Sequence, residues 1–175
     1  MLPPRDEREK GTSMLYSKRL RTAALFGLAA VGTIAAVAVA SPGAGITSTV
    51  LVTARLANVI QVNNDRVKFQ TKGPSDFRVQ KLVFAAGAHS GWHHHPGLLV
   101  VAVESGELVL TDANCGSRTY APGSPNGAVF IEGDGHPQIA SSPGGATVYV
   151  TYVVPSANPP VFRVEDPPVS TCAVP

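Results

Sequence analysis

Four of the five histidines in this 175-residue chain fall within seven residues of one another, in the segment 87–97. In an extended segment successive side chains point to opposite faces, so His93 and His95 share one face and His94 points to the other. A neutral imidazole is the commonest protein ligand for a transition metal. Two imidazoles hold one ion only if further ligands converge on it from elsewhere in the fold. We therefore expect a metal site built on His93 and His95, with His136 as the first candidate to complete it.

The other two histidines of this segment and its tryptophan have structural explanations. We expect His89 to lie in a turn and His94 to face away from the metal pair, which makes both of them rim or surface groups. Trp92 is expected to pack at the mouth of the fold. The whole segment could also be a structural turn in which hydrogen bonds satisfy the histidines and no ion is bound. Bound metal would separate these two interpretations.

The first 40 residues have the anatomy of an export signal. Residues 1–13 are polar, and they are either a leader or upstream of a true start at Met14. Basic residues then precede the uncharged run 22–40, which ends in small residues and predicts an apolar helix. Cleavage after Ala40 would export the domain to the cell envelope or beyond it. Because the run is barely long enough to span a membrane, residues 14–40 could instead be retained as an anchor in the cytoplasmic membrane, with the domain outside.

Removing this segment changes what the charge implies. The chain is formally +2, but residues 1–40 hold six of its 14 Lys and Arg and three of its 12 Asp and Glu. Residues 41–175 therefore carry eight basic and nine acidic groups, a formal charge of −1. A nucleic-acid surface needs clustered Lys and Arg, and this part of the chain has no such cluster. We expect no nucleic-acid partner, and membrane contact only through an uncleaved N-terminal segment.

The rest of the chain has the size of one domain and the pattern of an all-β protein. Gly and Pro are frequent, and short β-rich runs lie between turns, with no convincing helical period. Many short strands with regular turns are typical of a sandwich or a closed barrel, and a small antiparallel barrel has room for one ligand or one metal. The runs expected to form strands are 49–54, 77–84, 98–103, 107–111, 128–132, 138–140, 147–154 and 161–164.

Cys115 and Cys172 are the only cysteines. In an exported protein an even pair favours a disulfide over two free thiols, which is the alternative. A bridge would fasten the Pro-rich tail to the barrel. In the chain-entropy model it would stabilise the fold by about 4 kcal/mol, less any strain.

The histidine segment resembles a known family. The run Gly87-x5-His93-x-His95-x3-Leu99-x6-Gly106 is similar to the first conserved motif of the cupin superfamily, in which a glycine, two histidines and a glutamate precede a closing glycine. Segment 123–142 is similar to the second motif, which brings a further histidine near the end of a β-hairpin. With the two cysteines and the export signal, the chain resembles small exported bacterial cupin-domain proteins over residues 48–172. The resemblance implies a small antiparallel β-barrel or jelly roll that holds a metal ion.

The chain departs from the family pattern at two ligand positions. Leu99 stands where the family has its metal-binding glutamate, and a leucine cannot coordinate an ion. Gln138 stands where the second motif has its histidine, with His136 two residues earlier. On an extended strand His136 and Gln138 share a face, so either could reach the ion, although the turn 133–135 can reorient His136. Glu132 is only a weak substitute for the missing carboxylate.

The expected metal ligands are thus His93, His95, His136 and Gln138, with water at the remaining positions and Zn, Mn, Fe or Ni as the ion. Three neutral imidazoles would leave the ion's charge uncompensated, which favours Lewis-acid or water-activating chemistry. Three classes of function remain: a metal-dependent cupin enzyme such as an oxygenase or isomerase, a degenerate metal-free cupin that captures a small ligand, and an interaction domain of the envelope. The sequence identifies neither a catalytic residue nor a substrate, and it leaves a homodimer open.

Overall fold

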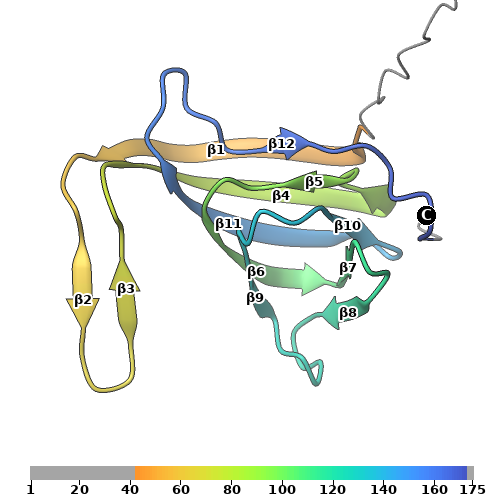
Figure 1. Ribbon diagram of the computed structural model, residues 1–175. Helices are drawn as coiled ribbons and strands as arrows, with labels where there is room; N and C mark the ends of the chain where they lie inside the picture. The colour runs from red at the N-terminus through yellow and green to blue at the C-terminus, as the bar shows by residue number, and fades with distance from the viewer. Residues whose placement is uncertain (1–41, 173–175) are drawn as a thin grey trace, which may run out of the picture. The chain divides into compact units, whose positions relative to one another are not determined.

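The computed structural model describes residues 42–172, and all regular elements in this part of the chain are strands (Figure 1). None of its described segments is a helix long and apolar enough to cross a membrane. The expected apolar helix at 14–40 and the polar segment 1–13 lie outside the described residues. The strands are β1 (Ala44–Leu56), β2 (Gln61–Asn63), β3 (Lys68–Gln70), β4 (Ser75–His89), β5 (His93–His94), β6 (Leu98–Gly106), β7 (Leu108–Asp112), β8 (Ser117–Tyr120), β9 (Val129–Glu132), β10 (Gln138–Ser142), β11 (Ala146–Pro155) and β12 (Val164–Glu165).

Ten of these strands form one antiparallel sheet that folds into a nearly closed barrel. One wall has the order β1-β4-β11-β6-β9, and the other has the order β12-β5-β10-β7-β8. The walls are joined where the end of β4 pairs with β10, His89 opposite Ser141 and Ala88 opposite Ser142. At the far edges of the two walls, β8 pairs only with β7 and β9 pairs only with β6. The second seam between the walls, where β8 and β9 are the edge strands, therefore has no strand pairing.

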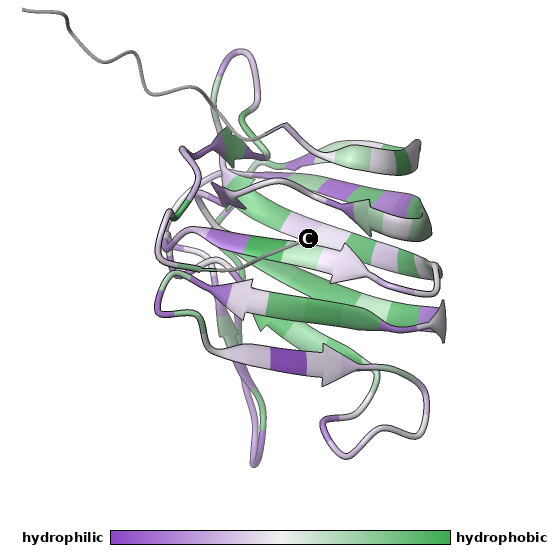
Figure 2. Cartoon of the chain, turned by 90° about the vertical axis from the view of Figure 1, so that its right-hand side faces the viewer, coloured by the Kyte–Doolittle hydropathy of each residue, from purple (hydrophilic) through white to green (hydrophobic). Residues whose placement is uncertain are grey.

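The interior of the barrel is filled by the side chains that alternation turns inward. Along β11 the inward residues are buried and the outward ones are half-buried, as period-2 patterning requires. The largest apolar side chains with almost no exposure include Leu99, Leu108, Val148 and Val154. Figure 2 shows hydrophobic residues concentrated along the strands and hydrophilic ones in the connections. A second, smaller cluster of Trp92, Ile139 and Cys172 lies outside this core and is covered by Val169.

Strands β2 and β3 form a two-stranded sheet of their own, apart from the barrel (Figure 1). Their side chains are exposed, apart from the half-buried Phe69. The base of the hairpin is closed by Thr71, whose Oγ1 accepts a hydrogen bond from the Ile60 amide and whose own amide donates to the Ile60 carbonyl.

The all-β barrel predicted from the sequence is confirmed, with two local corrections. His89 was expected in a turn, but it is the last residue of β4, because the strand continues through Gly87 at a φ of 76°. The run 161–164 was expected to be a strand, but pairing begins only at Val164. Phe162 is instead held in the core, where it packs against Tyr152. Strands β2, β3, β5 and β8 are short and largely polar, and hydrophobic patterning did not indicate them.

Candidate metal centre

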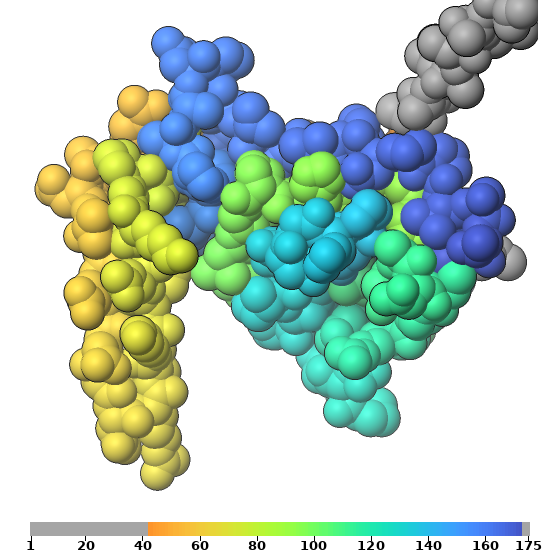
Figure 3. Space-filling view, in the orientation of Figure 1, coloured from red at the N-terminus to blue at the C-terminus, as the bar shows by residue number. Residues whose placement is uncertain are grey.

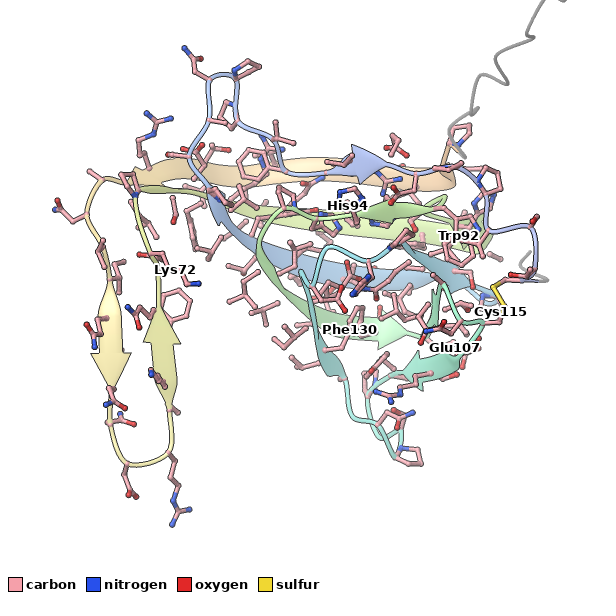
Figure 4. All side chains as sticks on the ribbon, in the orientation of Figure 1. Lys72, Trp92, His94, Glu107, Cys115 and Phe130 are labelled. Carbon is pink, nitrogen blue, oxygen red and sulfur yellow. A yellow bond between two sulfur atoms is a disulfide. The ribbon has the colours of Figure 1, made fainter. Side chains whose placement is uncertain are left out.

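Strand β5 is only two residues long, yet it sets the direction of three consecutive histidines. His93 and His95 are buried and line the barrel interior, whereas His94 is turned away from it. The His94 ring lies 2.8 Å from Oδ2 of Asp166, and Figure 4 shows its position on the ribbon. The alternation expected from the sequence is therefore observed. His89 is half-buried, and its Nδ1 accepts a hydrogen bond from the Gly91 amide.

The hydrogen bonds of His93 leave Nε2 free to act as a ligand. Its Nδ1 lies 2.9 Å from the carbonyl oxygen of Gly91. A carbonyl can only accept, so Nδ1 carries the proton and Nε2 has a lone pair. Burial, followed by the positive charge of Arg163 and the neighbouring His95, lowers the pKa of His93 from 6.5 to about 4. His93 is therefore neutral at neutral pH, the form that binds a metal.

The same logic orients His95. Its Nδ1 donates to the carbonyl oxygen of Phe162 at 2.6 Å. Its Nε2 faces Oε2 of Glu132 at 3.2 Å, and both side chains are almost completely buried, at 5% and 6% exposure. The His93 and His95 rings are perpendicular, with centroids 4.8 Å apart. Two histidines thus present fixed edges towards one carboxylate.

Glu132 provides a carboxylate beside Leu99, the position where the family motif has its metal-binding glutamate. It is the last residue of β9 and lies directly opposite Leu99 of β6. Directly opposed residues of an antiparallel pair project to the same face, about 4.5–5.5 Å apart at Cβ. A carboxylate from the neighbouring strand therefore enters the barrel beside the position where the family motif has its glutamate.

Gly133 allows the end of β9 to reach this position. Its φ is 121°, and a Cβ built on it would lie 2.0 Å from the carbonyl oxygen of Gly97. Only a glycine permits such a close approach between the end of β9 and the turn that follows His95. The backbone that carries Glu132 is thus pressed against the backbone that carries the second histidine.

The group formed by His93, His95 and Glu132 has the chemistry of a metal site. One ligand atom from each residue lies within 4.8 Å of the other two, and this is the one group of three or more possible ligands among the described residues. In the neutral ring with its proton on Nδ1, His95 would turn a lone pair towards the Glu132 carboxylate. Two acceptors facing each other in a buried site repel unless a proton or a cation lies between them. Two imidazoles and a carboxylate suit divalent Zn, Mn, Fe or Ni.

The three residues open onto a cavity of about 150 Å³ between the two walls. Most of its lining is aliphatic or aromatic, and the polar exceptions besides the ligand group include Gln80, Ser90 and Arg163. Burial, followed by the charge of Glu132, raises the pKa of Tyr152 to about 12, so its hydroxyl stays protonated. The cavity is small, and its lining is mostly apolar apart from the candidate ligands and these few polar groups.

The C-terminal segment 156–172 closes this side of the barrel. The guanidinium of Arg163 donates to the carbonyl oxygen of Ser90 and forms an ion pair with Glu165. Val164 pairs with His94, and Glu165 pairs with His93. In Figure 3 the blue C-terminal segment runs beside the green residues of β5. Together with the Phe162 carbonyl, these contacts make the segment part of the support for both histidines.

A disulfide fastens the end of this segment. Cys115, in the turn between β7 and β8, is bonded to Cys172, as the sequence predicted (Figure 4). Neither cysteine is free. Cys172 also packs on Trp92, which is 1% exposed and so is a packing residue.

The structure does not group His136 with the two buried histidines, and neither His136 nor Gln138 lines the cavity beside them. Gln138 pairs with His93 in the β5–β10 ladder, but the side chains of Gln138 and His136 line a different hollow. The glycine-flanked turn before His136 leaves its side chain exposed. Glu132 is the ligand candidate that the sequence reasoning undervalued. The runs 98–103 and 128–132, which pair as β6 and β9, were both predicted as strands, so the register between them was the signal that could have identified Glu132.

No family model matches the sequence, and no curated protein does. The chain is similar to solved structures that include cupin superfamily proteins. A cupin superfamily protein from Desulfitobacterium hafniense is 13% identical, with 67% of this chain and 84% of that chain covered and a TM-score of 0.44. The polyketide cyclase RemF from Streptomyces resistomycificus is 16% identical, with coverage of 72% and 76% and a TM-score of 0.47. A cupin-2 domain protein from Rhodospirillum rubrum is 12% identical, with coverage of 73% and 68% and a TM-score of 0.47.

At these identities the function must come from the residues of this chain. The fold and the site together define an antiparallel, nearly closed cupin-like barrel. Two histidines and one glutamate lie close together in its interior.

Proposed function

We propose that this protein is exported and binds one divalent transition metal through His93, His95 and Glu132, next to a cavity for a small organic molecule. The observation that carries the proposal is the buried 3.2 Å approach of the His95 Nε2 to the Glu132 carboxylate. The hydrogen bond to Phe162 leaves that nitrogen without a proton in the neutral ring, so a cation between the two groups resolves the repulsion. His93 adds a second neutral imidazole at the same point.

This ligand set replaces the one that the sequence suggested. The carboxylate supplies one negative charge, which the set of His93, His95 and His136 would not. His136 is exposed beyond the turn 133–135, and Gln138, although opposite His93, lines the other hollow. When bound, a divalent ion in such a site polarises an oxygen of the ligand or lowers the pKa of a bound water.

The protein's own groups set the size and polarity of what can bind. A volume of about 150 Å³ lies below the range of roughly 300–1,000 Å³ typical of drug-sized ligands. Apolar walls favour a compact and largely hydrocarbon molecule whose oxygen atoms face the metal. Gln80 and Arg163 are the polar lining groups with N–H donors, and both also donate to protein groups, Gln80 to Ser48 and Arg163 to Ser90 and Glu165.

Export is supported by the disulfide, because such bonds persist in oxidising compartments. The basic and apolar N-terminal sequence supports the same conclusion. A retained anchor would place the same domain outside the cytoplasmic membrane.

Metal analysis of the purified protein tests the proposal. We expect about one equivalent of a transition metal in the wild type and a strong loss in His93→Ala, His95→Ala and Glu132→Gln. His94→Ala is the matched control, because this residue belongs to the same histidine run but pairs with Asp166. Changes to the supporting shell of a metal cost roughly 10- to 100-fold in affinity, and loss of a ligand should cost more. A folded wild type that binds no Zn, Mn, Fe or Ni would leave the metal-free capture of a small ligand as the function.

A further inference from the structure

A second hollow lies at the other seam of the barrel, where β8 and β9 do not pair. It has a cavity volume of about 290 Å³, larger than the cavity beside the candidate metal ligands. Tyr120 lines it, whereas Phe130 lines the other cavity. These two rings are stacked, with centroids 4.4 Å apart, so the two spaces lie on either side of one aromatic contact. Phe130 is labelled in Figure 4.

Strand register gathers polar side chains on one face of this hollow. In the β10-β7 ladder Gln138 lies opposite Asp112, and in the β7-β8 ladder Leu110 lies opposite Arg118. Opposed residues share a face, so these four side chains form one patch on the wall. The loop after β9 adds His136 from the opposite side. These are the two residues, His136 and Gln138, that the metal site did not use.

The rim of the hollow is held in a fixed shape. Oδ1 of Asp112 accepts hydrogen bonds from the amides of Asn114 and Gly116, at 2.8 and 3.0 Å. Between these two residues Cys115 is tied to Cys172 by the disulfide. The rim therefore does not have to be ordered when a ligand binds, which favours affinity.

Several hydrogen-bonding groups in this hollow are free to bind a ligand. Among the described arginines, Arg55, Arg66 and Arg163 form ion pairs and Arg78 lies over the ring of Phe162. Arg118 does neither within residues 42–172, although its guanidinium carries five donors. The Gln138 amide and the His136 ring likewise have no hydrogen bond to another described side chain or backbone group.

The charge of the lining indicates which ligand chemistry fits. Asp112 and Asp134 contribute two negative charges and Arg118 one positive charge, a formal −1 with His136 neutral. This balance disfavours an anion. The described residues offer no metal-ligand group at this place, which disfavours a metal ion. A neutral molecule with many groups that both donate and accept hydrogen bonds suits a lining of carboxylates, an amide and a guanidinium.

We propose that this second hollow binds an uncharged polyhydroxylated compound of monosaccharide size. Leu110, Tyr120 and Ile131 provide an apolar surface for the C–H face of a sugar ring. Arg118, Gln138 and Asp112 provide planar groups for its hydroxyls. The volume of about 290 Å³ lies at the lower end of the roughly 300–1,000 Å³ usual for ligand sites, which suits one ring. This hollow differs from the cavity beside the metal ligands in its lining residues, although Gln138 lies opposite His93 in the β5–β10 ladder.

NMR titration of the purified protein tests this inference, with methyl glycosides of glucose, galactose and mannose and with myo-inositol as probes. We expect at least one probe to shift the amide signals of Arg118, His136 and Gln138. Arg118→Leu and Gln138→Leu should each weaken that binding by about tenfold or more, the effect of losing a charged or amide hydrogen bond.

Arg66→Leu is the matched control, because this arginine is exposed on the β2–β3 hairpin, and it should leave the shifts unchanged. The inference is overturned if none of the four probes shifts these signals at high millimolar concentration. It is equally overturned if the shifts map to the cavity beside His93 or survive both the Arg118→Leu and the Gln138→Leu substitution.

Discussion

Leu99 and Glu132 lie directly opposite each other on β6 and β9, both facing the barrel interior. The carboxylate that the family motif places on one strand is thus supplied by its neighbour. Exchange of the two side chains should preserve the site, because opposed residues of an antiparallel pair occupy adjacent positions on one face.

The double substitution Leu99→Glu/Glu132→Leu should therefore bind metal, whereas Glu132→Leu alone should not. Metal content and affinity measured against a competing chelator would check this. Leu99→Glu alone is the control for a second buried carboxylate. If the double variant is folded and still binds no metal, the two positions are not equivalent and the proposed geometry is wrong.

The metal-free protein should lose stability in mildly acidic solution because of His93. Its pKa of about 4 in the folded state is below the value of 6.5 expected when unfolded. Between these values the unfolded chain binds more protons, so the free energy of unfolding falls as the pH is lowered from about 6.5 towards 4. This pKa shift corresponds to a loss of about 3 kcal/mol in the free energy of unfolding, and the loss is complete once the pH is below the folded-state pKa of about 4. Urea unfolding in the presence of a chelator should show this slope.

His93→Asn should remove this contribution to the slope, and His94→Asn should keep it. An identical pH profile for the wild type and His93→Asn would show that His93 titrates normally in the folded protein.

Substitution of Gly133 should damage both fold and site. In Gly133→Ala the new Cβ would meet the Gly97 carbonyl at 2.0 Å, so the end of β9 must move away. We expect a loss of about 2 kcal/mol or more in the free energy of unfolding, together with weaker metal binding through Glu132. Gly135→Ala is the control, since Gly135 also has a positive φ, 77°, but no atom within 4 Å of its Cβ position. Equal effects of the two substitutions would mean that the Gly97 contact is unimportant.

The disulfide should stabilise the protein and keep Trp92 buried. It closes a loop with a sequence separation of 57 residues, worth about 4 kcal/mol in the chain-entropy model. Cys115→Ser/Cys172→Ser should therefore lower the Tm by roughly 10 °C.

Because Cys172 and Val169 cover Trp92, the emission of this single tryptophan should also shift to the red in the double serine variant. Reduction of the wild type should reproduce both effects. An unchanged Tm together with unchanged emission would show that the segment is held by its other contacts alone.

The all-β class, the disulfide pair and the shared face of His93 and His95 could all be predicted from the amino-acid sequence. Each of these depends on local alternation or on counting cysteines, which a linear sequence records directly. It did not determine the third ligand candidate. Strand parity could show that Leu99 faces inward, but only the antiparallel register between β6 and β9 puts Glu132 beside it. Register depends on long-range pairing and on the close approach of Gly133 to Gly97, which a linear sequence does not record. The carboxylate that lies beside the histidines, and the position of His136 and Gln138 in the other hollow, therefore follow only from the folded arrangement of the strands.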